Sequence, residues 1–279
     1  MKKTIFIFFI SLFSSFVSGQ NLKIMTYNLR FDNAGDGENA WPHRKETLVN
    51  QIRFYAPDVF GTQEGLEHQL RYMDKELKNY KYVGVGRADI KEKGDGEFSA
   101  VFYNTKKFNK LDEGTFWLSQ TPNKPSRGWD AALNRICTYI LLQDKEKGTK
   151  FYLFNTHFDH RGKEARKNSA SLILRKIKEI NKENVPFFLT GDFNLTPEEE
   201  PIRLIARELN DAKQVSGLPP FGPEGTFNGF KVCKAPKHRI DYIFVNDRII
   251  VKKYAVLASV KDVKYPSDHF PVFIKAQIK

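Results

Sequence analysis

The sequence predicts an α/β fold in which β-sheets pack face to face and helices cover their outer surfaces. Three observations support this prediction. Segments with strand character outnumber helical ones, several strands follow each other closely enough to form hairpins, and the helical segments carry apolar residues on one side only. Amphipathic helices of this kind cover a sheet from outside. A doubly wound parallel sheet fits the pattern less well.

The first half of the chain alternates strands with two helices. Pro42 falls in the first turn of the first predicted helix, where proline is favoured. Apolar residues recur at helical spacing in both helices. They are Leu48, Val49, Ile52 and Tyr55 in the first, and Leu66, Leu70, Met73 and Leu77 in the second. The predicted strands of this half are residues 22–29, 58–62, 82–85, 98–103 and 114–118.

The second half begins with a predicted hairpin, because residues 135–143 and 150–156 are strand-like and a turn containing Gly148 separates them. A long amphipathic helix over residues 164–180 and a short one over 201–208 follow. The remaining predicted strands are residues 186–190, 240–245, 250–258 and 270–278.

Residues 1–19 have the layout of a secretory signal peptide. Lys2 and Lys3 precede an apolar stretch from residue 4 to residue 17, and small residues end it at Gly19. The stretch is short for a membrane span, and no other segment approaches the required length. We therefore expect an exported protein without a stable membrane anchor, in the periplasm or the medium, whose folded domain is residues 20–279.

Charge and cysteine content narrow the function only slightly. Without Lys2 and Lys3, the formal net charge falls from +12 to about +10. A basic surface favours polyanions such as nucleic acid, anionic lipids or phosphorylated sugars. Cys137 and Cys233 lack the spacing of a metal site, and export permits a disulfide between them without requiring one.

Two polar residues follow apolar strands in the first half of the chain. Asn28 ends the first strand, and Glu64 follows the apolar residues 59–61. A carboxylate after a buried strand needs water, a base or a metal ion. A strand-end turn explains Asn28 alone more simply. Taken alone, Glu64 is explained equally well as an acidic residue at the start of a helix, where negative charge is favoured.

A third cluster contains His157, Asp159 and His160, directly after the strand at 150–156. Alternation places His157 and Asp159 on one side of the chain and His160 on the other. A lone histidine is usually a core or surface residue. Two histidines and a carboxylate at one strand end indicate a functional cluster instead.

A fourth motif, Thr-Gly-Asp-Phe-Asn at residues 190–194, follows the apolar strand before it. Asp192 and Asn194 share a side there, and Gly191 permits close approach of the backbone. The alternative is an ordinary turn, because Asp and Asn both favour turns. The strand-end position makes the motif fairly specific for a site.

Two further acidic motifs lie near the C-terminus. Asp241 falls within a strongly apolar strand, so its carboxylate must be paired or bind a ligand. An ion pair with Arg239 is the structural alternative. Asp268 and His269 precede the last strand, and an adjacent Asp and His suits a metal ligand beside a general base or transition-state stabiliser.

Together, these motifs resemble those of the endonuclease/exonuclease/phosphatase superfamily of deoxyribonuclease I-like proteins. The resemblance runs from Leu22 to the C-terminus. It implies a four-layer α/β/β/α sandwich of two mostly antiparallel sheets flanked by helices. Residues 114–119 and 128–132 are similar to an exported bacterial subgroup.

The resemblance implies a Mg²⁺-dependent hydrolase of phosphate esters, with Mn²⁺ as an alternative ion, that uses direct attack by water. The implied metal ligands are Asn28, Glu64 and Asp268. The implied catalytic residues are His157, Asp192, Asn194, Asp241 and His269. Asp192 would orient or deprotonate the attacking water, and Asn194 would hold the phosphate. His157 would contact the phosphate or assist the leaving oxygen, and Asp241 would position His269. Candidates for substrate contact are Arg135, Asp159 and His160.

The expected substrate is a small or sugar-like phosphate ester. A nuclease is the first alternative, although no duplex-penetrating loop is recognisable. A sphingomyelinase-type enzyme would need apolar docking loops, for which Phe221 and Phe230 alone are insufficient. A non-catalytic binding protein would be expected to lack one of the acidic residues or His269, and all are present. Mono- or diesterase activity and oligomeric state are left open.

Overall fold

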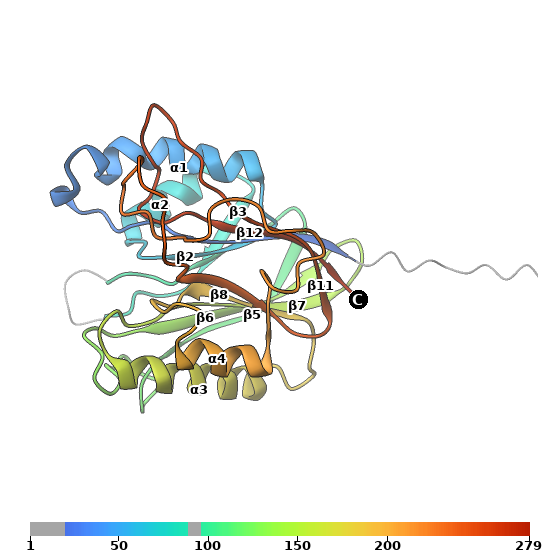
Figure 1. The fold of residues 1–279 in the computed structure, drawn as a ribbon. Helices are drawn as coiled ribbons and strands as arrows, with labels where there is room; N and C mark the ends of the chain where they lie inside the picture. The colour runs from blue at the N-terminus through green and yellow to red at the C-terminus, as the bar shows by residue number, and fades with distance from the viewer. Residues whose placement is uncertain (1–19, 89–95) are drawn as a thin grey trace, which may run out of the picture.

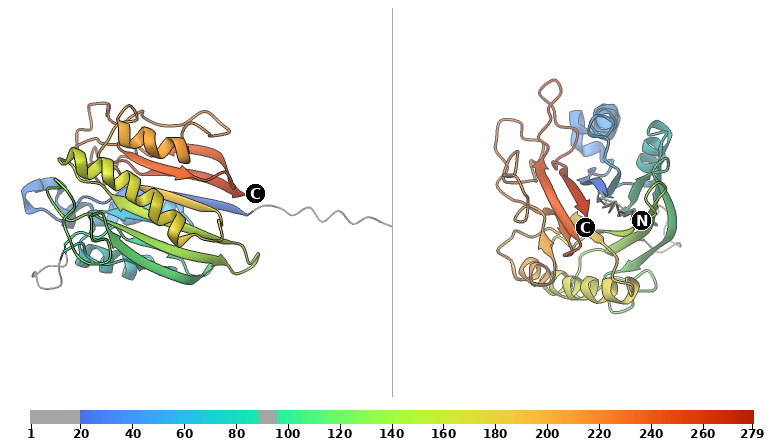
Figure 2. Two further views of the ribbon diagram at one scale, coloured as in Figure 1. Left: turned by 90° about the horizontal axis from the view of Figure 1, so that it is seen from below. Right: turned by 90° about the vertical axis from the view of Figure 1, so that its right-hand side faces the viewer.

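The computed structural model describes residues 20–88 and 96–279, which form four layers (Figure 1). Helices α1 (Trp41–Tyr55) and α2 (Glu67–Glu76) cover one six-stranded sheet. That sheet packs on a second, whose outer face carries α3 (Lys163–Ile180) and α4 (Glu200–Glu208) side by side (Figure 2). The predicted sandwich is confirmed, whereas the predicted signal peptide lies outside the described residues.

The first sheet has the strand order β11-β12-β1-β2-β4-β3. Its strands are β1 (Asn21–Asn28), β2 (Val59–Gln63), β3 (Tyr80–Val83), β4 (Val101–Asn104), β11 (Ile249–Val256) and β12 (Val272–Ile278). Strands β1 and β2 are parallel, and every other neighbouring pair is antiparallel.

The second sheet has the order β5-β6-β7-β8-β10-β9. Its strands are β5 (Phe108–Trp117), β6 (Ile136–Asp144), β7 (Lys150–His157), β8 (Phe187–Asp192), β9 (Asn210–Asp211) and β10 (Asp241–Val245). Here β7 and β8 form the parallel pair, and the other pairs are antiparallel. The prediction of mostly antiparallel sheets is therefore confirmed.

Several strand boundaries shift by one to three residues, and three elements differ more strongly from the prediction. Strand β5 begins at Phe108, six residues before the predicted start at Gly114, because its first part is a largely exposed polar edge without apolar alternation. The two-residue strand β9 is too short for any periodicity. A 3₁₀ helix at Ala34–Asn39 contains no buried residue and so carries no apolar signal.

Each interface between layers has its own apolar core, because successive strand residues point to opposite faces. On β1, Leu22 and Ile24 face the second sheet, whereas Met25 and Tyr27 face α1 and α2. On β8, Phe188 faces the first sheet, and its neighbours pack against α3 and α4. All strands of both sheets are thereby held in a fixed stack.

Within residues 20–88 and 96–279, none of the helices has the length and apolar character needed to cross a membrane. Cys137 is buried and Cys233 is exposed, and both are free thiols. Burial strongly raises the pKa of the Cys137 thiol, so this side chain is unreactive.

Candidate active site

The predicted functional residues converge at one edge of the stacked sheets because of strand direction. The parallel strands β1 and β2 end together, with Asn28 beside Gln63. The parallel strands β7 and β8 end with His157 beside Asp192, and the antiparallel strand β10 begins there with Asp241 opposite Asp192. Segments far apart in the sequence therefore meet at a single place.

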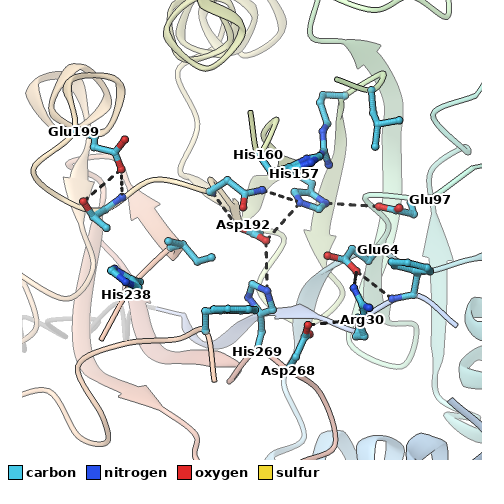
Figure 3. Close-up of a pocket in the computed structure, with 17 residues that line it drawn as sticks. Arg30, Glu64, Glu97, His157, His160, Asp192, Glu199, His238, Asp268 and His269 are labelled. Carbon is cyan, nitrogen blue, oxygen red and sulfur yellow. Dashed lines mark hydrogen bonds and ion pairs between the residues drawn. The ribbon is translucent and has the colours of Figure 1, made fainter. Parts of the chain in front are cut away.

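This edge contains a cavity of about 700 Å³, a size typical of small-ligand sites (Figure 3). Most predicted site residues line it, namely Glu64, Arg135, His157, His160, Asp192, Asn194, Asp268 and His269. Asn28, Asp159 and Asp241 do not line the cavity, and each is buried behind it.

Asn28 bridges the two sheets. Its Nδ2 donates to Glu64 Oε1 at 3.0 Å and to Asp192 Oδ2 at 3.0 Å, whereas its Oδ1 accepts from the Arg30 backbone at 3.0 Å. The amide oxygen is therefore occupied, and the nitrogen faces the carboxylates. Asn28 therefore holds two acidic groups in place, and its role as a metal ligand stays a prediction.

Three non-glycine residues at the site have left-handed backbone conformations: Arg30 at φ 56°, Glu64 at φ 61° and Asn194 at φ 51°. This conformation is uncommon for residues other than glycine and asparagine. Strained backbone of this kind persists where the surroundings fix it, and it clusters at functional sites. Here it turns Glu64 and Asn194 out of their strands and into the cavity.

His269 is held by Asp241. Its Nδ1 lies 2.9 Å from Asp241 Oδ2. Its Nε2 lies 3.8 Å from Asp192 Oδ2 (Figure 3). Burial acts to lower the pKa of His269, but the carboxylates of Asp241 and Asp192 raise this pKa well above its ordinary value. Arg239 pairs with Asp211 at 2.6 Å, so the alternative of an Arg239–Asp241 ion pair is wrong.

His157 has the opposite electrostatic character. Its Nε2 lies 3.1 Å from Asn194 Nδ2 and 3.5 Å from Asp192 Oδ2. Burial and the charge of Arg135 lower the pKa of His157 well below its ordinary value. The environment therefore favours the neutral form of His157 and the cationic form of His269.

Asp192 lies between the two histidines. Burial and the neighbouring Asp241 raise the pKa of Asp192 to about 7. Its Oδ1 accepts from the Asn194 backbone at 2.9 Å. A β-carbon on Gly191 would lie 2.2 Å from the Thr156 carbonyl oxygen, so glycine permits the close strand approach that was expected.

Glu97 also lines the cavity, and the sequence analysis missed it. Its carboxylate forms two 2.8 Å hydrogen bonds with Arg87, and Oε2 lies 3.9 Å from His157 Nδ1. Burial raises the pKa of Glu97. Glu97 lies in no regular strand, and isolated bridges from Phe98 to Gly65 and Gly86 bring its segment to the site. No local sequence pattern records such bridges.

Arg30 is a second residue that was missed as a site residue. It pairs with Asp36 through Nε at 2.9 Å and Nη2 at 2.8 Å. Its guanidinium also lies 4.0 Å from Glu64 and 3.9 Å from Asp268. Arg30 stands two residues after Asn28 in the sequence. The feature that could have indicated a site residue is that arginine is chemically suited to binding phosphate.

Arg135 and His160 line the cavity together, with Arg135 Nη2 3.0 Å from His160 Nδ1. Arg135 Nη1 is buried and has no hydrogen-bond partner among the described residues, which leaves a cationic donor for a ligand. Asp159 instead accepts backbone hydrogen bonds from Arg161, Gly162 and Ala132. Asp159 therefore fixes the surrounding loops from behind the cavity, and substrate contact by Asp159 stays a prediction.

The acidic residues fit a hard divalent cation. Glu64, His157 and Asp192 bring ligand atoms within 4.8 Å of one another, and Asp268 lines the same cavity. Burial, with a contribution from Glu64, raises the pKa of Asp268 as it does that of Asp192. Carboxylates crowded in a buried site are stabilised by a cation, and Mg²⁺ and Mn²⁺ prefer oxygen ligands.

Comparison with known proteins agrees with this geometry. Residues 25–269 match the model of the Endonuclease/Exonuclease/phosphatase family. A family protein of known structure from Bacteroides thetaiotaomicron is 39% identical, with a TM-score of 0.89 over 94% of this chain and 99% of that one. A mannosyl-6-phosphatase from the same organism is 40% identical, with a TM-score of 0.86 over 91% and 99%.

Human nocturnin is 23% identical over 281 residues, which cover 89% of this chain and 63% of nocturnin. This chain spans about six tenths of the length of the first curated relatives that it matches. The match over residues 25–269 and the similarity to full-length bacterial structures assign the family. The chain belongs to the endonuclease/exonuclease/phosphatase family, whose members are hydrolases that act on phosphate ester bonds.

Proposed function

We propose that this enzyme is a Mg²⁺- or Mn²⁺-dependent phosphomonoesterase that acts on a phosphorylated sugar. The main support is one nitrogen of the Arg135 guanidinium, which is buried without a partner among the described residues. Arg135 lines the cavity together with His157 and Asn194, which can also donate hydrogen bonds. Arginine recognises phosphate oxygens through paired hydrogen bonds. The 40% identity with a mannosyl-6-phosphatase favours a sugar monophosphate over nucleic acid.

The cavity contains a group for each requirement of direct hydrolysis. Arg135, Asn194 and neutral His157 bind the phosphate oxygens and orient the phosphorus atom. Asp192 lies between both imidazoles, orients the attacking water and accepts its proton as the water oxygen bonds to phosphorus. The bond between phosphorus and the sugar oxygen breaks as this bond forms, and the departing oxygen takes up a proton from solvent. His269, held by Asp241, donates to a phosphoryl oxygen as negative charge develops.

Glu64 and Asp268 would hold the metal ion, with Asn28 fixing the Glu64 carboxylate behind them. When bound, the ion supplies Lewis-acid stabilisation of phosphoryl charge. Arg30 lies within 4.0 Å of both carboxylates and limits the local negative charge. Its bidentate pair with Asp36 keeps the guanidinium beside the site.

A substrate panel tests the proposal. Phosphate release from mannose 6-phosphate and glucose 6-phosphate would be compared with hydrolysis of bis(p-nitrophenyl) phosphate, RNA and supercoiled plasmid, each with Mg²⁺ and Mn²⁺. We expect kcat/KM for a sugar monophosphate to exceed that for the diester by about tenfold or more, which is 1.4 kcal/mol of transition-state binding. Preferred cleavage of RNA or plasmid would reject a sugar phosphatase and support a nuclease.

Matched carboxylate variants test whether the proposed centre is responsible. Glu64→Gln should abolish metal-dependent turnover, because the amide lacks the negative charge that binds the ion. Glu208→Gln changes an exposed carboxylate on α4 that pairs with Lys178, and it should leave turnover intact. Equal activity of the two variants at every metal concentration would rule out Glu64 as a ligand.

We also propose that residues 1–19 direct export and are removed. N-terminal sequencing of the protein recovered from the periplasm or the culture medium should begin near Gln20. An intact Met1 on exported protein would contradict cleavage.

A further inference from the structure

A second, smaller cavity lies beside the catalytic one. It has a volume of about 190 Å³ and is formed by residues 227–238, here called the lysine loop. Phe227 and His238 line both cavities. A ligand that extends from the catalytic cavity across Phe227 therefore reaches the lysine loop directly.

The small cavity is strongly basic. Lys231, Lys234 and Lys237 line it together with His238, and none of the carboxylates in residues 20–88 and 96–279 does so. All three lysines are exposed, and within the described part of the chain none has an ion-pair partner. A neighbouring hollow, which Lys237 and His238 also line, contains the carboxylates of Glu198 and Glu224, and Glu224 pairs there with Lys213. Like charges gathered without counter-ions repel one another and attract an anion.

The lysine loop is fixed to the catalytic segment. The backbone N–H groups of Asn228 and Gly229 donate to the Asp268 carbonyl at 2.8 and 3.0 Å, and Asn228 Nδ2 donates to the Ser267 carbonyl at 3.1 Å. The Phe227 ring meets the His269 imidazole edge-on, with ring centroids 5.1 Å apart. The position of the basic cavity relative to the catalytic residues is therefore set by direct contacts.

From this arrangement we infer that the lysine loop is a second anion-binding site for the substrate. It takes a phosphate or another anionic group of the same molecule whose scissile phosphate lies in the catalytic cavity. Phe227, which is 42% exposed between the two cavities, offers an apolar surface for a sugar ring. The preferred substrate class is thus a small sugar ester with two anionic groups, an inference that rests on the proposed phosphomonoesterase function.

Equilibrium binding tests this inference without turnover. Fructose 1,6-bisphosphate and fructose 6-phosphate would be titrated calorimetrically into the full domain in EDTA. The affinities of the unmodified protein for the two ligands would be compared with those of the triple variant Lys231→Gln/Lys234→Gln/Lys237→Gln. Its control is Lys252→Gln/Lys253→Gln/Lys275→Gln, which removes three charges from exposed positions on β11 and β12 outside both cavities. Thermal unfolding confirms that both variants are folded.

The unmodified protein should bind the bisphosphate about tenfold more tightly than the monophosphate, as expected for one charge-assisted contact. The ratio should approach one in the lysine-loop variant and stay unchanged in the control. A ratio near one in the unmodified protein, or a ratio retained by the lysine-loop variant, would overturn the inference. A short single-stranded oligonucleotide is titrated in the same way. If the lysine-loop variant loses only oligonucleotide binding and keeps the sugar phosphate ratio, the inference is also overturned and the loop is assigned to nucleic acid.

Failure of the proposed function gives a different result. If no sugar monophosphate is hydrolysed with Mg²⁺ or Mn²⁺, the phosphomonoesterase assignment fails whatever the binding ratio is. The binding ratio still decides whether the lysine loop holds a second anion, because its measurement in EDTA does not depend on catalysis.

Discussion

Replacing Asp241 by asparagine removes the charge that holds His269 without changing the size of the side chain. Asp241 Oδ2 lies 2.9 Å from His269 Nδ1, and both side chains are buried. Within the part of the chain that the structure describes, Asp241 Oδ1 has no hydrogen-bond partner. A hydrogen bond to a charged group contributes about 1.5–3 kcal/mol. Since roughly 1.36 kcal/mol corresponds to a factor of ten in rate, kcat should fall about 10- to 100-fold.

A double-mutant cycle tests the reasoning, with kcat and KM measured on the best sugar phosphate. His269→Ala should lower kcat by about 10²–10⁴-fold, the usual contribution of a general acid or base. Because Asp241 acts through His269, adding Asp241→Asn to His269→Ala should change kcat by less than about twofold. KM should be little affected, because Asp241 does not line the cavity.

Additive losses in the cycle would refute the positioning role of Asp241. A second refuting result would be a large rise in KM with unchanged kcat, since that result would place Asp241 in ground-state binding. Circular dichroism of each variant distinguishes a lost contact from a lost fold.

Three other predictions concern stability. Burial acts to raise the pKa of Asp159, but backbone hydrogen bonds outweigh it and lower this pKa to about 2. The ionised carboxylate therefore stabilises the fold at pH values above the unfolded pKa of about 3.9. This stabilisation is lost as the pH falls toward 2. Asp159→Asn should therefore destabilise the protein by about 2 kcal/mol at pH 7, and the difference in urea unfolding should narrow below pH 4; a constant difference would contradict this. Gly61→Ala places a β-carbon 2.2 Å from Asn155 Oδ1 and should cost about 1–3 kcal/mol, whereas an unchanged urea midpoint would show that Asn155 can move. Mg²⁺ should raise the unfolding temperature of the unmodified protein and raise that of Glu64→Gln less; equal shifts would place the ion elsewhere.

The residues that could be predicted are those with a local signal. Glu64, His157 and Asp192 follow apolar strands that fold into β2, β7 and β8, and His269 precedes β12. Period-two alternation locates such strands, and a polar side chain at their ends is a poor choice for folding alone. The same reasoning located the layers, because each strand and helix carries its own apolar face.

The remaining features depend on contacts between distant segments. Glu97 reaches the cavity through irregular bridges at Phe98, which alternation does not record. Asp159 and Asp192 both follow apolar strands, yet backbone amides surround Asp159 while Asp192 faces two histidines. The local sequence signal of a strand-end carboxylate is the same in both cases. Only tertiary packing distinguishes a carboxylate that holds loops in place from one that faces the cavity.

The distance between the carboxylates of Glu64 and Asp192 depends on how the two sheets are joined. Glu64 follows β2 in the first sheet, whereas Asp192 ends β8 in the second. Asn28 donates to both carboxylates. Behind it, Asn155 of β7 donates to the Thr62 and Ala100 carbonyls and accepts from Gln63 Nε2 at 2.7 Å. A buried polar network is costly unless its members are satisfied together. These hydrogen bonds therefore favour one position of the two sheets relative to each other, and the packing that completes the fold also brings Glu64 and Asp192 together.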